Sequence, residues 1–206
     1  MNSTIEILHK KSVELDRLAN VRNTKFFPTL WFFTDHERNP EPYNILNQLP
    51  KNTGIVFRDY NAKRRKKMAL KMADFCNKNK LILLIAGDTK LALEVGASGV
   101  HIPEYNKFNL PYLKPNKPNW IVSASVHNQH MLKKVTSFGV NIIFLSPIFY
   151  TSSHPYGKTL GIHNLRRLTK EFSIFSIALG GINKNSISKL NGSGINGIAA
   201  ISGFFN

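Results

Sequence analysis

Two apolar runs in the last third of the chain each end in small residues, a pattern that suits the binding of an anion. The first run is followed by Gly180 and Gly181, and the second ends at Ile201 and is followed by Ser202. Glycine has no Cβ, so its backbone N–H can approach a bound oxyanion closely. The pattern predicts a phosphate site formed by these four residues. The alternative that it leaves open is a pair of tight turns without a ligand.

Polar side chains also follow other apolar runs, where barrel enzymes carry their working residues. Arg58 and Ser125 could contact an anion or a substrate, whereas His101 is expected to be a satisfied core histidine. Because a buried guanidinium without a partner is costly, Arg58 could instead pair with Asp35 or Asp88. A polar loop near residue 150 favours ligand binding through its hydroxyl and imidazole groups, although it could equally be a packed lid. Its candidate binding residues are Thr151, Ser153 and His154.

Short apolar runs alternate with amphipathic stretches along the chain, which is typical of a parallel sheet with helical crossovers. The predicted strands are residues 30–34, 54–58, 81–86, 99–102, 120–125, 141–145, 174–179 and 197–201. Eight strands favour a closed barrel over an open sheet, so the predicted fold class is α/β, a (β/α)8 TIM barrel. We expect one domain over residues 1–206, with a helical extension over 1–25 and the barrel over 26–206.

The N-terminal extension carries apolar residues at roughly helical spacing, namely Ile5, Leu8, Leu15 and Leu18. The sequence leaves no room for a full helix after the eighth strand. We therefore expect the N-terminal helix to pack near the gap that a final helix would otherwise fill.

Composition and charge narrow the classes of function. The chain has 206 residues, of which 42% are hydrophobic, and a net charge of +16. No run is long enough to span a membrane, no signal peptide pattern is present, and the single cysteine, Cys76, fits a reducing cytoplasm. The densest basic run, residues 63–67, precedes apolar residues at helical spacing and predicts the exposed first turns of a helix. No nucleic-acid motif accompanies the charge, so we expect no specific nucleic-acid partner and no membrane partner.

Several pieces of the chain occur in an order that resembles a known superfamily. They are TD at 34–35, FR at 57–58, LALEVGASGVH at 91–101, SVH at 125–127, SPIFYTSSHP at 146–155, ALGGIN at 178–183 and GIAAISGFF at 197–205. Together they resemble the thiamine phosphate synthase superfamily, which also contains the thiazole tautomerase. The resemblance implies a role in thiamine biosynthesis and two small phosphorylated partners, a thiazole phosphate and a pyrimidine diphosphate. It also implies Mg²⁺ for the synthase reaction, which is a transfer that expels pyrophosphate.

The chain departs from the synthase pattern where that pattern holds the diphosphate. The second-strand motif of the synthases resembles Q-x-R-x-K, and the aligned residues are Val56, Arg58 and Tyr60, so only the arginine is kept. A lysine expected after the sixth strand aligns with His154. The resemblance nevertheless assigns Arg58 a catalytic role.

The metal positions depart as well. Ala86 and Gly87 stand where the synthases have Asn-Asp, whose aspartate binds the metal. Mg²⁺ prefers carboxylate oxygens, and Asp88 and Glu104 could supply them only from shifted positions. These departures argue against efficient transferase activity in a synthase-like protein.

The tautomerase branch fits several of these departures better. It also lacks the metal aspartates, and its proton carrier is a histidine in an S-V-H segment that maps onto His127. Transfer of a proton near neutral pH is within the range of histidine. Alternatively, His127 only bonds a neighbouring backbone group. The functions left open are a weakened synthase, a metal-independent thiazole tautomerase using His127, and a non-catalytic phosphate-ligand binder. The oligomeric state is left open too, with a homodimer as one form.

Overall fold

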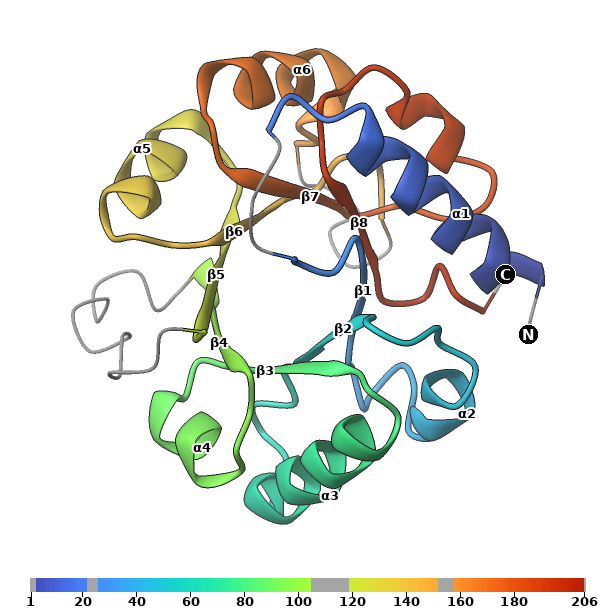
Figure 1. The fold of residues 1–206 in the computed structure, drawn as a ribbon, viewed down its shortest axis with the longest axis vertical. Coiled ribbons are helices and arrows are strands. Elements are labelled where there is room, and N and C mark those ends of the chain that lie inside the picture. The colour runs from blue at the N-terminus through green and yellow to red at the C-terminus, as the bar shows by residue number, and fades with distance from the viewer. Residues whose placement is uncertain (1–2, 22–25, 105–118, 152–157, 206) are drawn as a thin grey trace.

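The computed structural model describes residues 3–21, 26–104, 119–151 and 158–205, and its parallel strands form a closed barrel (Figure 1). Neighbouring strands pair in chain order, and the first strand pairs with the last through Leu30 with Ile198 and Phe32 with Ala200. The strands are β1 (Leu30–Phe33), β2 (Gly54–Phe57), β3 (Ile82–Ala86), β4 (Gly99–Ile102), β5 (Ile121–Val126), β6 (Ile142–Leu145), β7 (Phe175–Leu179) and β8 (Gly197–Ala200). The predicted (β/α)8 TIM barrel is confirmed.

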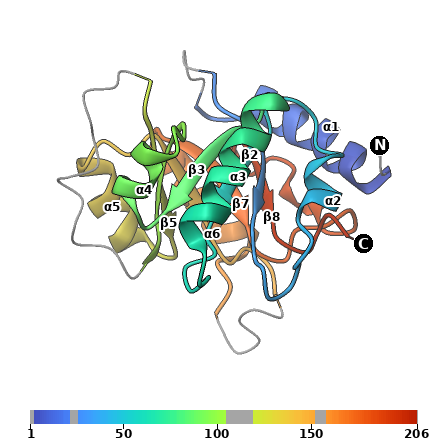
Figure 2. The same ribbon diagram turned by 90° about the horizontal axis from the view of Figure 1, so that it is seen from below.

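Helices surround the strands on the outside of the barrel, as two views at right angles show (Figures 1 and 2). They are α1 (Ser3–Arg17), α2 (Tyr43–Leu46), α3 (Arg65–Lys78), α4 (Thr89–Glu94), α5 (Gln129–Ser137), α6 (Gly161–Glu171) and the 3-10 helix η3 (Ile187–Leu190). The sequence pattern does not predict α2, because four residues are too few to show a helical period. The crossover before β8 is a 3-10 turn rather than an amphipathic α-helix.

Alternation of side chains along each strand divides the core into two clusters. The inner cluster fills the barrel with aromatic rings stacked edge to face: the ring centroids of Trp31 and Phe144 lie 5.3 Å apart, and those of Phe33 and Phe144 lie 4.9 Å apart. The outer cluster lies between the barrel wall and the helices and includes Leu83 and Ile85. Because the interior of the barrel is packed, the ends of the strands and their loops, rather than the centre of the barrel, are the expected place for its active site.

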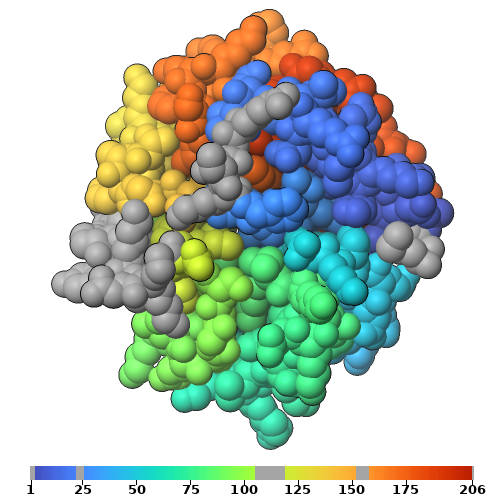
Figure 3. All heavy atoms as spheres, viewed as in Figure 1, coloured from blue at the N-terminus to red at the C-terminus, as the bar shows by residue number. Residues whose placement is uncertain are grey.

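The N-terminal helix α1 packs against β1, β8 and η3, as expected for an element beside the closing pair of strands. Figure 3 shows blue atoms of this segment lying against the red and orange atoms of the C-terminal third. Ile5 and Leu8 are fully buried, whereas Leu18 is 65% exposed because the helix ends before it. The side chain of Asn196 donates to Asp16 Oδ1 at 2.9 Å, which fixes the end of α1 to the loop before β8.

The basic run at the start of α3 is exposed, as predicted, with one exception. Arg65 keeps only 16% of its side chain exposed, because it pairs with Asp88 Oδ2 at 3.2 Å. Within the described part of the chain, no helix is long and apolar enough to cross a membrane. Cys76 is buried in α3, and this burial raises the pKa of its thiol to about 12, which agrees with a packing role.

Candidate active site

A cavity of about 180 Å³ lies between the loops that follow β7 and β8. The structure brings the four predicted phosphate residues together in its lining, namely Gly180, Gly181, Ile201 and Ser202. Both glycines have a left-handed backbone, with φ of 97° and 68°. A Cβ on Gly180 would lie 2.8 Å from Pro147 Cα, and one on Gly181 would lie 2.5 Å from Tyr150 O. Neither position accepts a side chain, so the backbone remains accessible to a ligand.

Thr151 and Arg38 also belong to the lining of this cavity. Thr151 is one of the predicted binding residues, whereas Arg38, from the loop after β1, is a cation that the sequence analysis missed. The Nε of Arg38 lies 3.3 Å from Asp35 Oδ2, and 37% of its side chain is exposed. The guanidinium therefore adds positive charge to the wall of a cavity suited to an anion. Ser153 and His154, the other candidates of the polar loop, lie outside the described residues.

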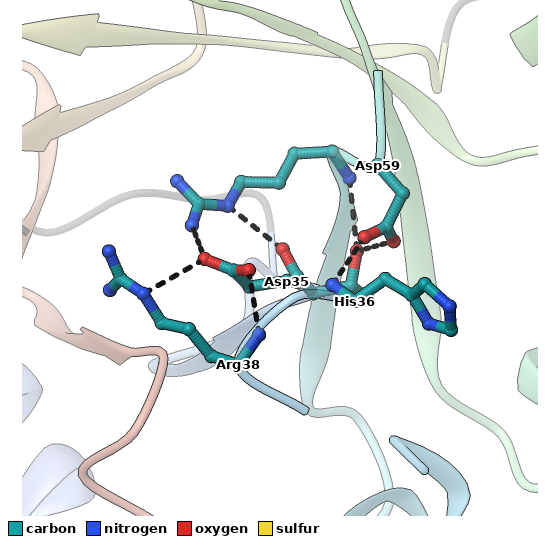
Figure 4. A network of polar contacts seen from close by, with 6 residues as sticks. Asp35, His36, Arg38 and Asp59 are labelled. Atoms are coloured by element: carbon teal, nitrogen blue, oxygen red, sulfur yellow. Dashed lines mark hydrogen bonds and ion pairs between the residues drawn. The ribbon is translucent and has the colours of Figure 1, made fainter. Parts of the chain in front are cut away.

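Arg58 follows β2 and makes polar contacts with the end of β1. Figure 4 shows Asp35, His36, Arg38 and Asp59 of this network. The Nη2 of Arg58 pairs with Asp35, and its Nε donates to Thr34 O at 2.8 Å. Asp59 accepts hydrogen bonds from the Thr34 hydroxyl and, at 2.7 Å, from the backbone N–H of His36. Of the two partners considered for Arg58, Asp35 is therefore the observed one. Its Nη1 makes no hydrogen bond with the described residues, which leaves donors for an anionic ligand.

His127 follows β5 at the same end of the barrel. Its Nδ1 lies 2.6 Å from the backbone oxygen of Ser146, after β6, and its Nε2 lies 3.2 Å from Glu104 Oε2, after β4. A carbonyl oxygen can only accept a hydrogen bond, so Nδ1 carries a hydrogen. The backbone contact expected as the alternative is present, but it engages only Nδ1, and 27% of the side chain stays exposed.

His101 lies deeper in the barrel, in edge-to-face contact with the rings of both Phe33 and Phe144. Its two ring nitrogens lie 2.9 Å from Ser123 Oγ and 3.0 Å from Ser125 Oγ. Burial, reinforced by the positive charges of Arg58 and of His127, lowers the pKa of His101 to about 3. It is the satisfied core histidine that was expected, and Ser125 is placed beneath the site by its contact with it.

A family model matches the part of the chain that forms the strand ends described above. Residues 33–204 match the model described as thiamine monophosphate synthase. The chain belongs to the thiamine monophosphate synthase family. The match runs from the end of β1 to the segment after β8, so it includes every strand end described above.

Individual relatives of this family agree. A protein of Aquifex aeolicus named "Putative thiamine-phosphate synthase 2" is 34% identical over 86% of this chain and 97% of its own length. A thiamine-phosphate synthase of Prochlorococcus marinus subsp. pastoris is 30% identical over 73% of this chain, which spans only 43% of that protein. A solved thiamine phosphate pyrophosphorylase from Pyrococcus furiosus superposes with a TM-score of 0.73 at 23% identity, covering 92% of this chain and 88% of that one. At this identity, the superposition supports the fold alone.

The two carboxylates considered for Mg²⁺ have other partners in this member of the thiamine monophosphate synthase family. Asp88 caps α4, accepting from Leu91 N at 2.8 Å, and its other oxygen pairs with Arg65. Glu104 faces His127. Among the described residues, no group of three potential metal ligands is found. With a guanidinium and a helix cap on Asp88, its carboxylate is poorly placed to share a Mg²⁺ ion with Glu104.

Sequence reasoning missed two residues of the site. Arg38 lines the anion cavity, and Asp59 supports the end of β1. Both are charged residues close to a predicted strand end, which was the available signal. Neither could be assigned a partner, because loop conformation decides which cavity an arginine reaches.

Proposed function

We propose that this protein binds a thiazole phosphate with its phosphate group in the cavity after β7 and β8, and moves a proton on that ligand through His127. One observation carries the proposal: the imidazole of His127 is held between Ser146 O and Glu104 at the barrel end where the anion cavity lies. This is the activity of the tautomerase branch on a thiazole carboxylate phosphate. It requires no metal.

The anion cavity supplies binding and orientation. The glycine backbone after β7 allows phosphate oxygens close to its N–H groups, and Arg38 adds a cation to the wall. Charge-assisted hydrogen bonds of this kind are among the stronger polar contacts in proteins. They would fix one end of the ligand and leave its ring near the centre of the barrel mouth.

His127 has one nitrogen for orientation and one for chemistry. Nδ1 donates to Ser146 O, so it keeps its hydrogen in both charge states of the ring. Nε2 is then the atom that takes up and returns the proton, and it lies 3.2 Å from Glu104 Oε2. The neutral His101 below does not compete for this proton at neutral pH.

The synthase reaction is the second candidate, favoured by the names of the relatives and by Arg58, whose Nη1 makes no hydrogen bond within the described part of the chain. This nitrogen could bind a diphosphate, and Arg58 remains at the position that the resemblance makes catalytic. The engagement of Asp88 with Arg65 and the cap of α4 weighs against it, because the transfer depends on Mg²⁺.

Two assays on the purified chain separate the candidates. The first follows isomerisation of a thiazole carboxylate phosphate in the presence of EDTA, and the second follows thiamine phosphate formation with Mg²⁺. We expect isomerisation in EDTA, reduced about 10²- to 10⁴-fold in His127→Gln, the range typical of a lost general acid–base group. His130→Gln, which changes an exposed histidine in α5, is the matched control and should keep full activity.

Other outcomes would overturn the proposal in distinguishable ways. Thiamine phosphate formed only with Mg²⁺, and lost in Arg58→Ala, would establish the synthase. Tight binding of the thiazole phosphate without turnover in either assay would establish a non-catalytic binder. Isomerisation that survives in His127→Gln would assign the proton transfer to another group.

A further inference from the structure

A second cavity lies outside the barrel wall, between the segment after β1 and helix α3. Its volume is about 160 Å³. Phe57 in its lining belongs to the outer core cluster, so strand β2 separates this cavity from the barrel interior. The residues that give the cavity its character are Asn39, Pro40, Tyr43, Phe57, Met68 and Met72. The proposed proton transfer makes no use of it.

Asn39 is an unsatisfied donor in this lining. The residue is 8% exposed, and its Nδ2 has no hydrogen-bond partner in the part of the chain that the structure describes. Its backbone N–H is satisfied by Asp35 O at 2.8 Å, so only the side-chain amide lacks an acceptor. Buried donors are rarely left without a partner, because each loses its hydrogen bonds to water. An acceptor atom on a bound molecule would satisfy this amide.

The remaining walls suit an uncharged aromatic ring. Phe57 and Tyr43 contribute aromatic side chains to the lining, and thioethers such as those of Met68 and Met72 make favourable contacts with aromatic rings. An apolar cavity of about 150 Å³ is known to hold one benzene molecule, so this volume suits a single ring. A larger, two-ring ligand would not fit without displacing a wall.

The charges around the cavity do not favour an ionic ligand. Asp35 already pairs with Arg58 and Arg38, and Asp59 accepts from Thr34 and from the backbone of His36. The exposed Lys71 carries its charge in contact with water. A neutral ligand leaves these hydrogen bonds and the hydration of Lys71 undisturbed, whereas an added ion would first have to lose its own hydration.

We propose that this cavity is a binding site for a small, neutral, single-ring nitrogen heterocycle whose ring nitrogen accepts a hydrogen bond from Asn39 Nδ2. The site is separate from the anion cavity, which lies between the loops after β7 and β8. Asp35 and Asp59 line this cavity and also belong to the network around Arg58. A bound ligand would therefore lie next to two members of that network.

The methionines allow a direct test by NMR. The chain has four, of which Met68 and Met72 line the cavity and Met131 is buried in α5. We would label the methionine methyl groups with ¹³C and titrate the wild-type protein with pyridine, and separately with benzene, at neutral pH. We expect saturable shifts at Met68 and Met72, with a dissociation constant on the order of millimolar for so small a ligand, and no shift at Met131.

Asn39→Leu tests the hydrogen bond. It removes the donor and should weaken pyridine binding about fivefold to tenfold relative to benzene binding, the effect of one lost hydrogen bond. Met68→Trp fills the cavity and should abolish the shift at Met72 with both probes. If either variant does not fold, the wild-type titration still decides whether the cavity binds a ring.

Three results would overturn the proposal. One is the absence of saturable shifts at Met68 and Met72. Another is an equal shift at Met131, which would mean that the probes bind without preference. The third is an unchanged ratio of pyridine to benzene affinity in Asn39→Leu, which would remove Asn39 as the recognising group.

Discussion

At the scale of single residues, two histidines at one end of the barrel show how surroundings decide what a side chain can do. His101 is 2% exposed, and both of its ring nitrogens face serine hydroxyls. His127 keeps one nitrogen on a backbone oxygen and turns the other toward a carboxylate. A neutral, fully bonded ring organises its neighbours, whereas a ring beside a carboxylate can change charge during a reaction.

The buried His101 makes a prediction for stability in acid. Its pKa falls from 6.5 to about 3 on folding, so between these values the unfolded chain binds a proton that the folded chain does not. Stability should therefore fall as the pH is lowered through this window, by at most about 1.4 kcal/mol per pH unit from this residue. Urea unfolding at several pH values measures the slope.

His101→Gln provides the comparison, because glutamine can bond both serines without titrating. If it folds at neutral pH, its stability should depend less steeply on pH than that of the wild type. Equal slopes in the two proteins would show that His101 does not control the acid response.

At the scale of elements, the turn after β7 is the part of the site that depends most on backbone conformation. Gly181 combines a φ of 68° with a position where a Cβ would lie 2.5 Å from Tyr150 O. The same turn lines the anion cavity. A side chain here would therefore disturb both the turn and the loop that carries Thr151.

Gly181→Ala is expected to lower stability and to weaken binding of inorganic phosphate. The matched control is Gly96→Ala, because Gly96 has nearly the same φ, 67°, but no atom within 4 Å of a built Cβ. In the control, the free energy of unfolding should fall only by the conformational cost of a left-handed alanine, about 1–2 kcal/mol. Urea unfolding and phosphate titration of both variants separate the backbone strain at positive φ from the steric clash of the added Cβ. If Gly181→Ala loses no more stability than the control, the predicted steric clash does not occur.

The positions of the strands could be predicted from the sequence more closely than the contacts between side chains of different elements. Each strand is an apolar run bounded by polar or small residues, and the runs at 81–86 and 99–102 differ from the observed strands by at most one residue. The grouping of Gly180 with Ser202 follows from neighbouring parallel strands. By contrast, the engagement of Asp88 with Arg65 depends on how α3 and α4 pack, and no local pattern reports that.

At the scale of the whole molecule, closure of the barrel brings the first helix to the last strand. Ile5 and Leu8 of α1 are buried in the outer core, and the helix contacts β8 as well as β1. Asn196 adds polar contacts, donating to Val21 O at 2.8 Å and accepting from Ser176 N at 3.1 Å. The helix therefore stabilises the junction of β1 and β8, and is part of the barrel's core.

Two isoleucines in α1 test this contribution. Ile5 is fully buried and Ile7 is 46% exposed on the same helix. Ile5→Ala should lower the free energy of unfolding by about 2–5 kcal/mol, since it leaves a cavity in the core. Ile7→Ala should change it by less than about 0.5 kcal/mol. Similar losses in both variants, measured by urea unfolding, would mean that α1 does not pack as described.

The pairing of α1 and β1 with β8 also has a consequence for the protein during its synthesis. Residues made first acquire the full set of their native neighbours only when β8 has left the ribosome. Until then, α1 lacks its contacts with β8, and one edge of β1 has no partner strand. Contacts between such distant segments form slowly, and exposed strand edges favour association with other chains. The nascent chain should therefore be most prone to aggregate just before β8 emerges, and a chaperone that covers the N-terminal segment would then be of most use.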